Sequence, residues 1–286
     1  MTEGEVRHRL LARASPWPAS SGSPGDWNAE DVRRLTDDTG REVELPDAVT
    51  RVVSIVPSLT ETVAVTAPGL LAGATDWCTH PVDLDVPRVR GTKNPDVDRI
   101  VALRPDVVLA NAEENRLPDL DALRSAGVPV WVTDVRTLDA AFGSLERMLA
   151  ACGLDRPAWL GEAEAAWSDV AGLSPRRRAV VPVWRRPWMA VGSDTFTGDV
   201  LARLGVDNVL DGVQDRYPRI ALDDLPTVDL VVLPDEPYRF TPDDGPEAFP
   251  DVPAALVSGR HLTWYGPSLV EAPAVLLAQL SSPLIR

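Results

Sequence analysis

Cysteine is scarce in this chain: Cys78 and Cys152 are the only two among 286 residues. Two cysteines far apart in the sequence provide no disulfide framework, so we expect two reduced thiols. No segment approaches the ~20 apolar residues of a membrane-spanning helix, so we predict a protein that is not embedded in a membrane. The first residues contain neither a continuous apolar segment nor a cysteine that could take a lipid. As written, the chain is predicted to be cytoplasmic, and extracytoplasmic if its natural start lies elsewhere.

Positive charge is also in deficit. The chain has 28 Lys and Arg against 43 Asp and Glu, a formal net charge of -15 at pH 7. Nucleic-acid-binding proteins present clustered basic surfaces, so we exclude nucleic acid as a partner. Catalytic motifs are missing as well, since the chain has no phosphate-binding loop, no nucleophile elbow, no His-Glu-x-x-His helix and no Cys-x-x-Cys pair. We therefore expect a protein that is not an enzyme and has no intrinsic cofactor or dedicated metal site, and we expect a monomer.

The most informative segment that is present joins a strand to a helix at residues 51–61. Residues 52–56 are a short, mostly β-branched apolar run, typical of a parallel strand covered on both faces. Pro57 follows directly, and Ser58 and Glu61 have the spacing of a capping box at a helix start. Such helix starts lie at the carboxyl ends of strands, where open α/β sheets bind their ligands. This turn is therefore a candidate edge of a binding site.

Strands and helices alternate along most of the chain, which predicts βαβ units and parallel sheets. Residues 1–34, rich in Ser, Pro, Ala and Gly, predict a disordered tail, and residues 34–46 predict a hairpin whose turn contains Asp38 and Gly40. The predicted fold is α/β, with two Rossmann-like lobes joined by a long backbone helix. The lobes are placed at 35–137 and 175–286, and the helical connector at 138–174. Because helices couple lobes more stiffly than a Gly/Ser linker, little hinge motion is expected.

The individual elements follow from hydrophobic periodicity and from helix start and stop signals. In the first lobe we predict strands at 52–56, 71–75, 107–110 and 128–132, and helices at 60–66, 97–102 and 117–126. In the connector we predict helices at 138–152 and 158–170, because Gly153 ends the first and Pro157 precedes the second. In the second lobe we predict strands at 179–183, 230–233 and 254–257, and helices at 197–204 and 268–280.

Several segments, in this order and spacing, resemble a known family. They are residues 36–43 (Thr-Asp-Asp-Thr-Gly-Arg-Glu-Val), 51–61 (Arg-Val-Val-Ser-Ile-Val-Pro-Ser-Leu-Thr-Glu), 75–81 (Thr-Asp-Trp-Cys-Thr-His-Pro) and 94–110, which begins Asn-Pro-Asp. The chain resembles the helical-backbone metal receptors, the class III substrate-binding proteins of ABC importers, over about residues 36–286. Residues 76–81 and 262–268 (Leu-Thr-Trp-Tyr-Gly-Pro-Ser) are most similar to the cobalamin-binding branch.

The resemblance implies non-catalytic binding of a metal chelate in the cleft between the lobes. A cobalamin-like corrinoid is the expected ligand, and the chain would be the substrate-binding component of an ABC-type uptake system or a cytosolic relative of one, with an ABC permease as the possible partner. Three alternatives stay open: a ferric siderophore or haem binder, a cytosolic metal or tetrapyrrole enzyme on a related two-lobed fold, and a scaffold that acts through protein contacts.

The candidate ligand-binding residues lie in loops that follow predicted strands. Trp77 and Trp264, one in each lobe, are expected to offer indole platforms to a flat ligand, since indole combines a large contact area with a low entropy cost. His80 and His261 lie in the same two loops, as metal-binding imidazoles or as ordinary hydrogen-bonded histidines. The full set of expected ligand contacts is Trp77, His80, Asn94, Trp184, Trp188, His261, Trp264 and Tyr265. Each tryptophan could instead pack within its own loop.

Two acidic positions and one charged loop complete the candidate site. The resemblance assigns Glu61 and Asp194 to docking on permease arginines, one from each lobe, although Glu61 has the capping box as a local alternative. Residues 113–116 (Glu-Glu-Asn-Arg) follow a predicted strand and are therefore expected on the cleft side. Their charges could recognise a polar ligand or simply solvate the loop.

Overall fold

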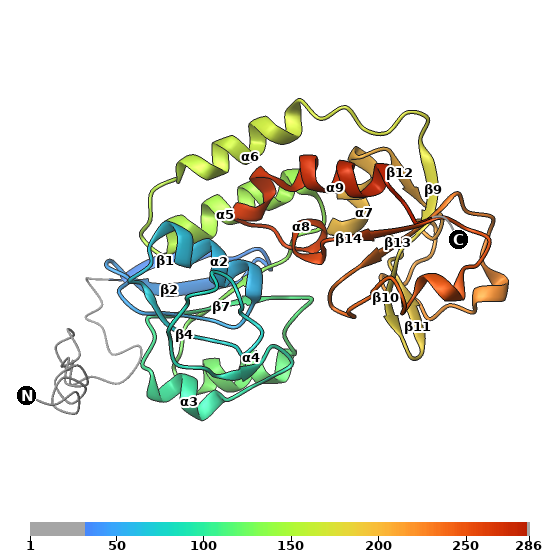
Figure 1. Ribbon diagram of the computed structural model, residues 1–286. Helices are drawn as coiled ribbons and strands as arrows, with labels where there is room; N and C mark the ends of the chain where they lie inside the picture. Colours follow the sequence, from blue (N-terminus) through green and yellow to red (C-terminus); the bar gives the residue numbers. More distant parts are fainter. Residues whose placement is uncertain (1–31, 285–286) are drawn as a thin grey trace, which may run out of the picture.

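The computed structural model describes residues 32–284, which form two αβ lobes bridged by helices (Figure 1). The predicted tail, residues 1–34, falls mostly outside the described residues, and its last three residues correct the prediction. Strand β1 (Val32–Thr36) begins within them and pairs antiparallel with β2 (Glu42–Pro46). The expected hairpin is thus confirmed, with Gly40 at a φ of 80° in its turn. The Asp37 carboxylate accepts the backbone N–H groups of Thr39 and Arg41, which fixes this turn.

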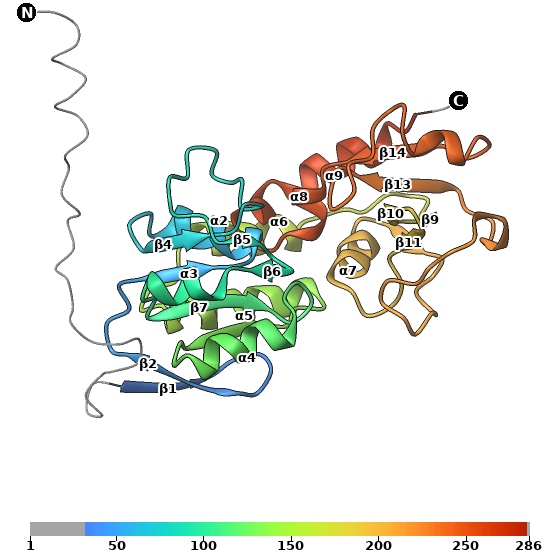
Figure 2. The ribbon, with the colours of Figure 1, turned by 90° about the horizontal axis from the view of Figure 1, so that it is seen from below.

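A four-stranded parallel sheet with the order β4-β3-β7-β8 forms the centre of the first lobe. Every residue of β7 and β8 is buried, as expected for apolar strands covered on both faces. Helices α3 and α4 cover one face of the sheet, and α2 and α5 (Leu138–Ala151) cover the other (Figure 2). The elements are β3 (Val52–Ser54), α2 (Pro57–Thr66), β4 (Leu71–Ala74), β5 (Arg90–Gly91), β6 (Asn94–Pro95), α3 (Val97–Ala102), β7 (Val107–Asn111), α4 (Leu117–Ser125) and β8 (Val130–Thr133).

The start of α2 corrects the predicted capping box. The helix begins at Pro57 with Val56 as its cap residue, and no side chain caps it. Proline suits the first helical position because the N–H that it lacks would have no helical partner there. Ser58 consequently lies inside the first turn, where its hydroxyl cannot act as the cap. Glu61 is released from the capping role and reaches the other lobe.

Two helices bridge the lobes, as the sequence predicts. Helix α5 (Leu138–Ala151) is capped by Thr137, whose hydroxyl accepts the Ala140 N–H at 3.2 Å. Gly153, at a φ of 73°, lies in the turn before α6 (Ala158–Ser168). The Trp167 indole of α6 donates to the Leu269 carbonyl at 3.0 Å, which ties the bridge to the C-terminal segment.

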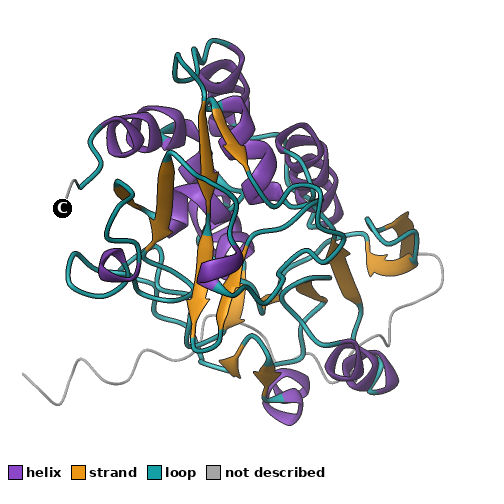
Figure 3. Ribbon diagram, turned by 90° about the vertical axis from the view of Figure 1, so that its right-hand side faces the viewer, coloured by secondary structure: helices purple, strands orange, loops and turns teal. Residues whose placement is uncertain are grey.

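The second lobe has its own four-stranded parallel sheet, with the order β12-β9-β13-β14. Figure 3 views the molecule from the side of this lobe. The strand predicted at 179–183 is in fact divided, because Pro182 has no N–H to continue the sheet and starts a separate hairpin. The predicted last helix is likewise split into η3 and α9. The elements are β9 (Arg177–Val180), β10 (Pro182–Arg185), β11 (Trp188–Ala190), α7 (Phe196–Arg203), β12 (Val206–Asn208), η1 (Leu222–Asp224), β13 (Leu230–Pro234), η2 (Pro246–Ala248), β14 (Ala254–Val257), α8 (Gly259–Thr263), η3 (Pro267–Val270) and α9 (Ala272–Ser281).

One hydrophobic core runs through both lobes and the bridging helices. It includes Trp131 of β8, Leu145 of α5, Val232 of β13 and Leu276 of α9, all almost fully buried. The outer face of each sheet has a smaller cluster of its own. Because close-packed interiors resist deformation, a core shared in this way favours a fixed angle between the lobes.

Two further observations bear on the sequence analysis. Both cysteines are free and buried, Cys78 in the first lobe and Cys152 at the end of the bridging helix α5. Across residues 32–284, we find no helix with the length and apolar character needed to cross a membrane.

Candidate functional site

Polar side chains at the carboxyl ends of two strands in the first lobe meet a tyrosine of the second lobe. Asn111 ends β7 and Thr133 ends β8. The Asn111 side-chain amide donates to the Tyr265 hydroxyl at 2.6 Å, and the Thr133 hydroxyl lies 2.9 Å from the same oxygen. Burial raises the pKa of Tyr265, so the phenol stays neutral at physiological pH. Tyr265, expected as a ligand contact, therefore fastens the two lobes together.

Glu61 forms a buried ion pair across the same junction. Only 4% of the residue is exposed, and its carboxylate accepts the Arg260 guanidinium, with Nε 3.2 Å from Oε1. Arg260 lies on α8 and also reaches Glu271 at 3.2 Å. A buried carboxylate paired in this way is not presented at the surface. The structure thus gives Glu61 a role between the lobes instead of the exposed position that docking on a permease needs.

Asp194 has a comparable partner but a different exposure. Its carboxylate bonds the guanidinium of Arg136, a first-lobe residue between β8 and α5, while 62% of the Asp194 side chain remains exposed. The backbone of Asp194 has a φ of 53°, an uncommon conformation for a residue with a side chain. Both acids that the resemblance assigns to docking therefore bond an arginine of the opposite lobe.

His80 and Trp264 also meet across the junction, whereas Trp77 stands apart. The two rings pack edge to face with their centroids 5.5 Å apart, and Trp264 is 8% exposed. Burial, and secondarily the Arg260 charge, lowers the pKa of His80, so its imidazole is neutral at pH 7. Trp77 is 66% exposed in the loop after β4 and makes no ring contact with Trp264 among the described residues. The structure therefore does not pair the indoles of Trp77 and Trp264 as expected. Instead His80 contacts Trp264, and the Trp77 indole remains exposed.

Trp184 and Trp188 belong to the hairpin β10–β11 and pack within the second lobe. Trp188 is stacked on Phe240 and meets Phe249 edge to face, while Trp184 contacts Tyr238. Arg185 lies 5.4 Å from the centroid of the Trp188 ring and bonds acidic residues of the same lobe. Packing within the lobe, the alternative left open by the sequence, describes Trp188 best. Trp184 keeps an exposed surface of 44%.

The remaining candidates are held by local contacts. His261 lies on α8, with Nδ1 2.7 Å from the Ser258 hydroxyl and Nε2 2.9 Å from Glu271. It is therefore the hydrogen-bonded histidine that the sequence left as an alternative. Asn94 is exposed on β6, opposite Gly91 in the small hairpin β5–β6. Within residues 32–284 no group of three or more His, Cys, Asp or Glu could hold a metal ion.

A charged surface between the lobes was only partly anticipated. The Arg216 guanidinium bonds the Glu113 carboxylate at 2.8 Å, and the Lys93 ammonium donates to the Glu113 carbonyl at 2.7 Å. Sequence reasoning placed Glu113 and Glu114 on the cleft side, but Arg216 lies in a segment without a regular pattern, and no signal marked it. This is the third ion pair between the lobes, after Glu61–Arg260 and Asp194–Arg136.

Two carboxyl groups in this region are unusually basic. Burial and, next, the charges of Asp235 and Glu114 raise the pKa of Glu236 to about 7. Burial likewise raises the pKa of Glu114, although the residue itself is accessible to solvent. We call Glu113, Glu114, Arg216 and Glu236 the interlobe charge cluster, and it lies where the carboxyl ends of the two sheets approach each other.

Comparison with known proteins agrees with this architecture. No family model matches the chain. An uncharacterized ABC transporter substrate-binding lipoprotein of Bacillus subtilis (strain 168) is 28% identical over 161 residues, 52% of this chain and 51% of that protein. A vitamin B12-binding protein of Vibrio parahaemolyticus is 22% identical over 194 residues, 65% of this chain and 70% of that protein. The chain thus matches about half of the first relative's length.

Solved structures extend the likeness to nearly the whole described fold. The periplasmic vitamin B12 binding protein of Vibrio cholerae superposes with a TM-score of 0.63 at 16% identity, covering 82% of this chain and 97% of that one. A periplasmic heme-binding protein from Roseiflexus sp. RS-1 superposes with a TM-score of 0.69 at 18% identity, covering 82% and 98%. The chain therefore has the two-lobed fold of the class III periplasmic binding proteins and is related in sequence to the substrate-binding proteins of ABC transporters.

Proposed function

We propose that the chain binds a metal chelate without transforming it, as the substrate-binding component of an ABC-type uptake system. One observation carries the proposal: the carboxyl ends of both parallel sheets meet at one junction, where Asn111 and Thr133 bond Tyr265 and where Glu236 and Glu114 approach each other. Ligands of open α/β sheets bind outside the carboxyl ends of the strands, so this junction is the expected ligand site. The names of the sequence relatives point to the same role.

The charges at the junction favour a corrinoid over haem. Glu114 and Glu236 have no hydrogen-bonded partner for their carboxyl groups among the described contacts, and desolvation raises the pKa of both. A corrinoid presents neutral amide side chains that can bond such carboxyls in either protonation state, whereas the two carboxylates of haem would be repelled by them whenever they are ionised. A vitamin B12-binding relative supports this choice. A heme-binding neighbour in fold makes haem the second candidate to test.

Trp77 is the residue best suited to pack against the ligand from the first lobe. Its indole is 66% exposed, which leaves a large and rigid apolar face free to contact a flat ligand. His80, three residues along the same loop, already touches Trp264 of the second lobe. A ligand entering the junction beside this contact would meet the Trp77 face, with Asn94 contributing a polar edge.

The setting and the partner follow from the relatives. One is named as a lipoprotein and others in fold as periplasmic proteins, which supports an extracytoplasmic location and does not support the cytoplasmic location expected from the sequence as written. The partner would then be an ABC permease. Of the two acids expected to dock there, Asp194 has the exposed carboxylate, so docking through this lobe is the stronger proposal.

A fluorescence titration tests the proposal, since the chain contains 9 tryptophans. Cobalamin is expected to quench the emission saturably, and Trp77→Ala is expected to weaken binding at least tenfold, about 1.4 kcal/mol. Trp184→Ala is the matched control, because this exposed indole packs on Tyr238 within the second lobe. Haem and ferric siderophores complete the panel. Unchanged cobalamin affinity in Trp77→Ala, or equal losses in both variants, would contradict the assigned site.

A further inference from the structure

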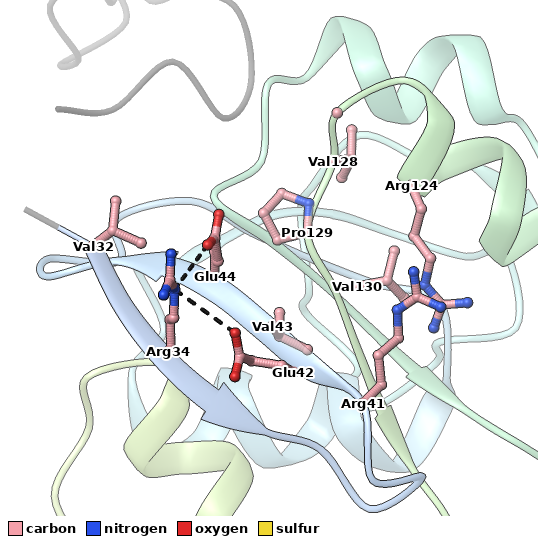
Figure 4. Close-up of a pocket in the computed structure, with 11 residues that line it drawn as sticks. Val32, Arg34, Arg41, Glu42, Val43, Glu44, Arg124, Val128, Pro129 and Val130 are labelled. Atoms are coloured by element: carbon pink, nitrogen blue, oxygen red, sulfur yellow. Dashed lines mark hydrogen bonds and ion pairs between the residues drawn. The ribbon is translucent and has the colours of Figure 1, made fainter. Parts of the chain in front are cut away.

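A hollow lies away from the interlobe junction, between the hairpin β1–β2 and the turn that leads from α4 into β8 (Figure 4). Its volume is about 960 Å³. Apolar side chains from β2 and β8 form part of its wall, and charged side chains form the rest. The charged residues that line it are Arg34, Arg41, Glu42, Glu44 and Arg124.

Arg34 is neutralised by acids of the same hairpin. Its Nε lies 2.9 Å from the Glu44 carboxylate and 3.7 Å from the Glu42 carboxylate, so this end of the hollow has no surplus of positive charge. Figure 4 draws these three side chains together, apart from the remaining two arginines. Arg34 therefore has no need of a further anion.

Arg41 and Arg124 are not neutralised in the same way. Arg41 is exposed, and its guanidinium has no ion pair or hydrogen bond within residues 32–284. Arg124 bonds the exposed Asp121 through Nη1 at 3.0 Å, but its buried Nε has no hydrogen-bond acceptor. A buried donor without an acceptor costs free energy, about 1–3 kcal/mol, and an anion held by the outer nitrogens of the Arg124 guanidinium would offset part of this cost. A positive charge is favourable in the last turn of a helix, which explains an arginine at this position of α4. It does not explain why the Nε lacks an acceptor.

We propose that this hollow binds the phosphate group of a small phosphate ester, with Arg41 and Arg124 as its cationic contacts. Guanidinium groups bond phosphate through parallel N–H···O bonds, and Arg41 offers a positive charge without an acidic partner among residues 32–284, whereas Arg124 shares its charge with the exposed Asp121. The volume falls in the range of small-molecule sites, which leaves room for the organic part of the ester beside the phosphate. The site is separate from the interlobe junction and does not depend on the function proposed there.

Isothermal titration calorimetry of the full chain with glucose 6-phosphate, inorganic phosphate and glucose tests this site. Saturable binding of a phosphate-bearing ligand is expected, with no binding of glucose. Arg41→Gln should raise the dissociation constant at least tenfold. A tighter constant for the ester than for inorganic phosphate supports an organic phosphate as the ligand. Equal constants would contradict a contact with the organic part and leave free phosphate as the ligand.

The control is Arg156→Gln, which removes an acid-paired surface arginine between α5 and α6 that neither lines the hollow nor belongs to the interlobe junction. Its dissociation constant should equal that of the unmodified chain. Arg124→Gln should act like Arg41→Gln, and if it fails to fold, the exposed Arg41 decides the question alone. Equal constants for Arg41→Gln and the unmodified chain, or no saturable binding of either phosphate ligand at millimolar concentration, would overturn the proposal.

Discussion

The Tyr265 hydroxyl is the residue-scale contact on which the geometry of the junction depends. Replacing Tyr265 by Phe removes the acceptor of the Asn111 amide at 2.6 Å and the partner of the Thr133 hydroxyl. Because the site is buried, we expect a loss of about 1–3 kcal/mol in the free energy of unfolding, measured by urea titration. Tyr238→Phe is the control, since this partly buried hydroxyl has a single bond to Asp244. Losses of equal size in the two variants would contradict the special role of Tyr265.

Glu236 gives the junction a defined dependence on pH. Its folded-state pKa of about 7 lies above the ordinary 4.5, so folding disfavours its ionised form. Below about pH 4.5 the carboxyl is protonated in both states; between 4.5 and 7 the unfolded chain releases the proton first, and stability is lost as pH rises. Glu236→Gln should therefore gain stability relative to the unmodified chain over this window, as thermal melts at several pH values would measure.

Glu271 provides the opposite sign for comparison. The hydrogen bond from His261 lowers the pKa of the Glu271 carboxyl, so its contribution to stability is present above its unfolded pKa and is lost as pH falls. Glu271→Gln should accordingly be most destabilising near neutral pH. If the stability changes of Glu236→Gln and Glu271→Gln varied with pH in the same direction, the raised pKa of Glu236 would not be the cause of the effect of Glu236→Gln.

At the scale of elements, the segment after α8 is held against α2 by a close backbone approach. A Cβ added at Gly266 would lie 2.7 Å from the Thr62 hydroxyl and 3.2 Å from the Ser58 carbonyl. Gly266→Ala should therefore cost about 1–3 kcal/mol of unfolding free energy in a denaturant titration. Adding Thr62→Ala should recover part of the loss. Gly69→Ala, which has nothing within 4 Å of the added carbon, should be neutral, and a comparable loss there would refute the packing argument.

The elements that the sequence predicts are those whose apolar pattern is decided locally. The periodicity of 97–102 and 254–257 reproduces α3 and β14 to the residue. The prediction was wrong at two prolines. Helix α2 begins at Pro57, so Ser58 lies inside the helix and is not its cap, and Pro182 divides one predicted strand into two. Helix α8 was not predicted at all, because five residues are too few for a periodic signal.

The candidate site was less predictable than the fold, because its contacts join residues far apart in sequence. Strand ends place Glu113 and the loop of His80 on the side that faces the second lobe, but nothing local pairs Glu61 with Arg260, 199 positions away. In the folded chain Glu61 is paired with Arg260 of α8 and is buried. Its carboxylate is therefore not exposed, as docking on a permease would require. The sequence likewise identified the aromatic residues by type but not by burial. Trp77 is 66% exposed, whereas Trp264 is only 8% exposed and packs against His80 of the other lobe.

For the whole molecule, the shared core predicts a single cooperative unfolding transition. Leu145 of α5 is fully buried in the core that also contains residues of both sheets. Leu145→Ala should cost about 2–5 kcal/mol and lower the midpoint for the entire chain. Calorimetry should give one transition whose calorimetric and van't Hoff enthalpies agree. Two separate transitions, with only one of them shifted by the substitution, would contradict a core that unites the lobes.

The central claim, that the junction of the two lobes takes a corrinoid, is tested most directly by titrating cobalamin into the full chain while following tryptophan emission. We predict saturable quenching, a rise in melting temperature with cobalamin concentration as for any ligand of the folded state, and at least tenfold weaker binding of haem. Emission and melting temperature that stay unchanged at every cobalamin concentration, or haem binding that is tighter than cobalamin binding, would contradict the claim.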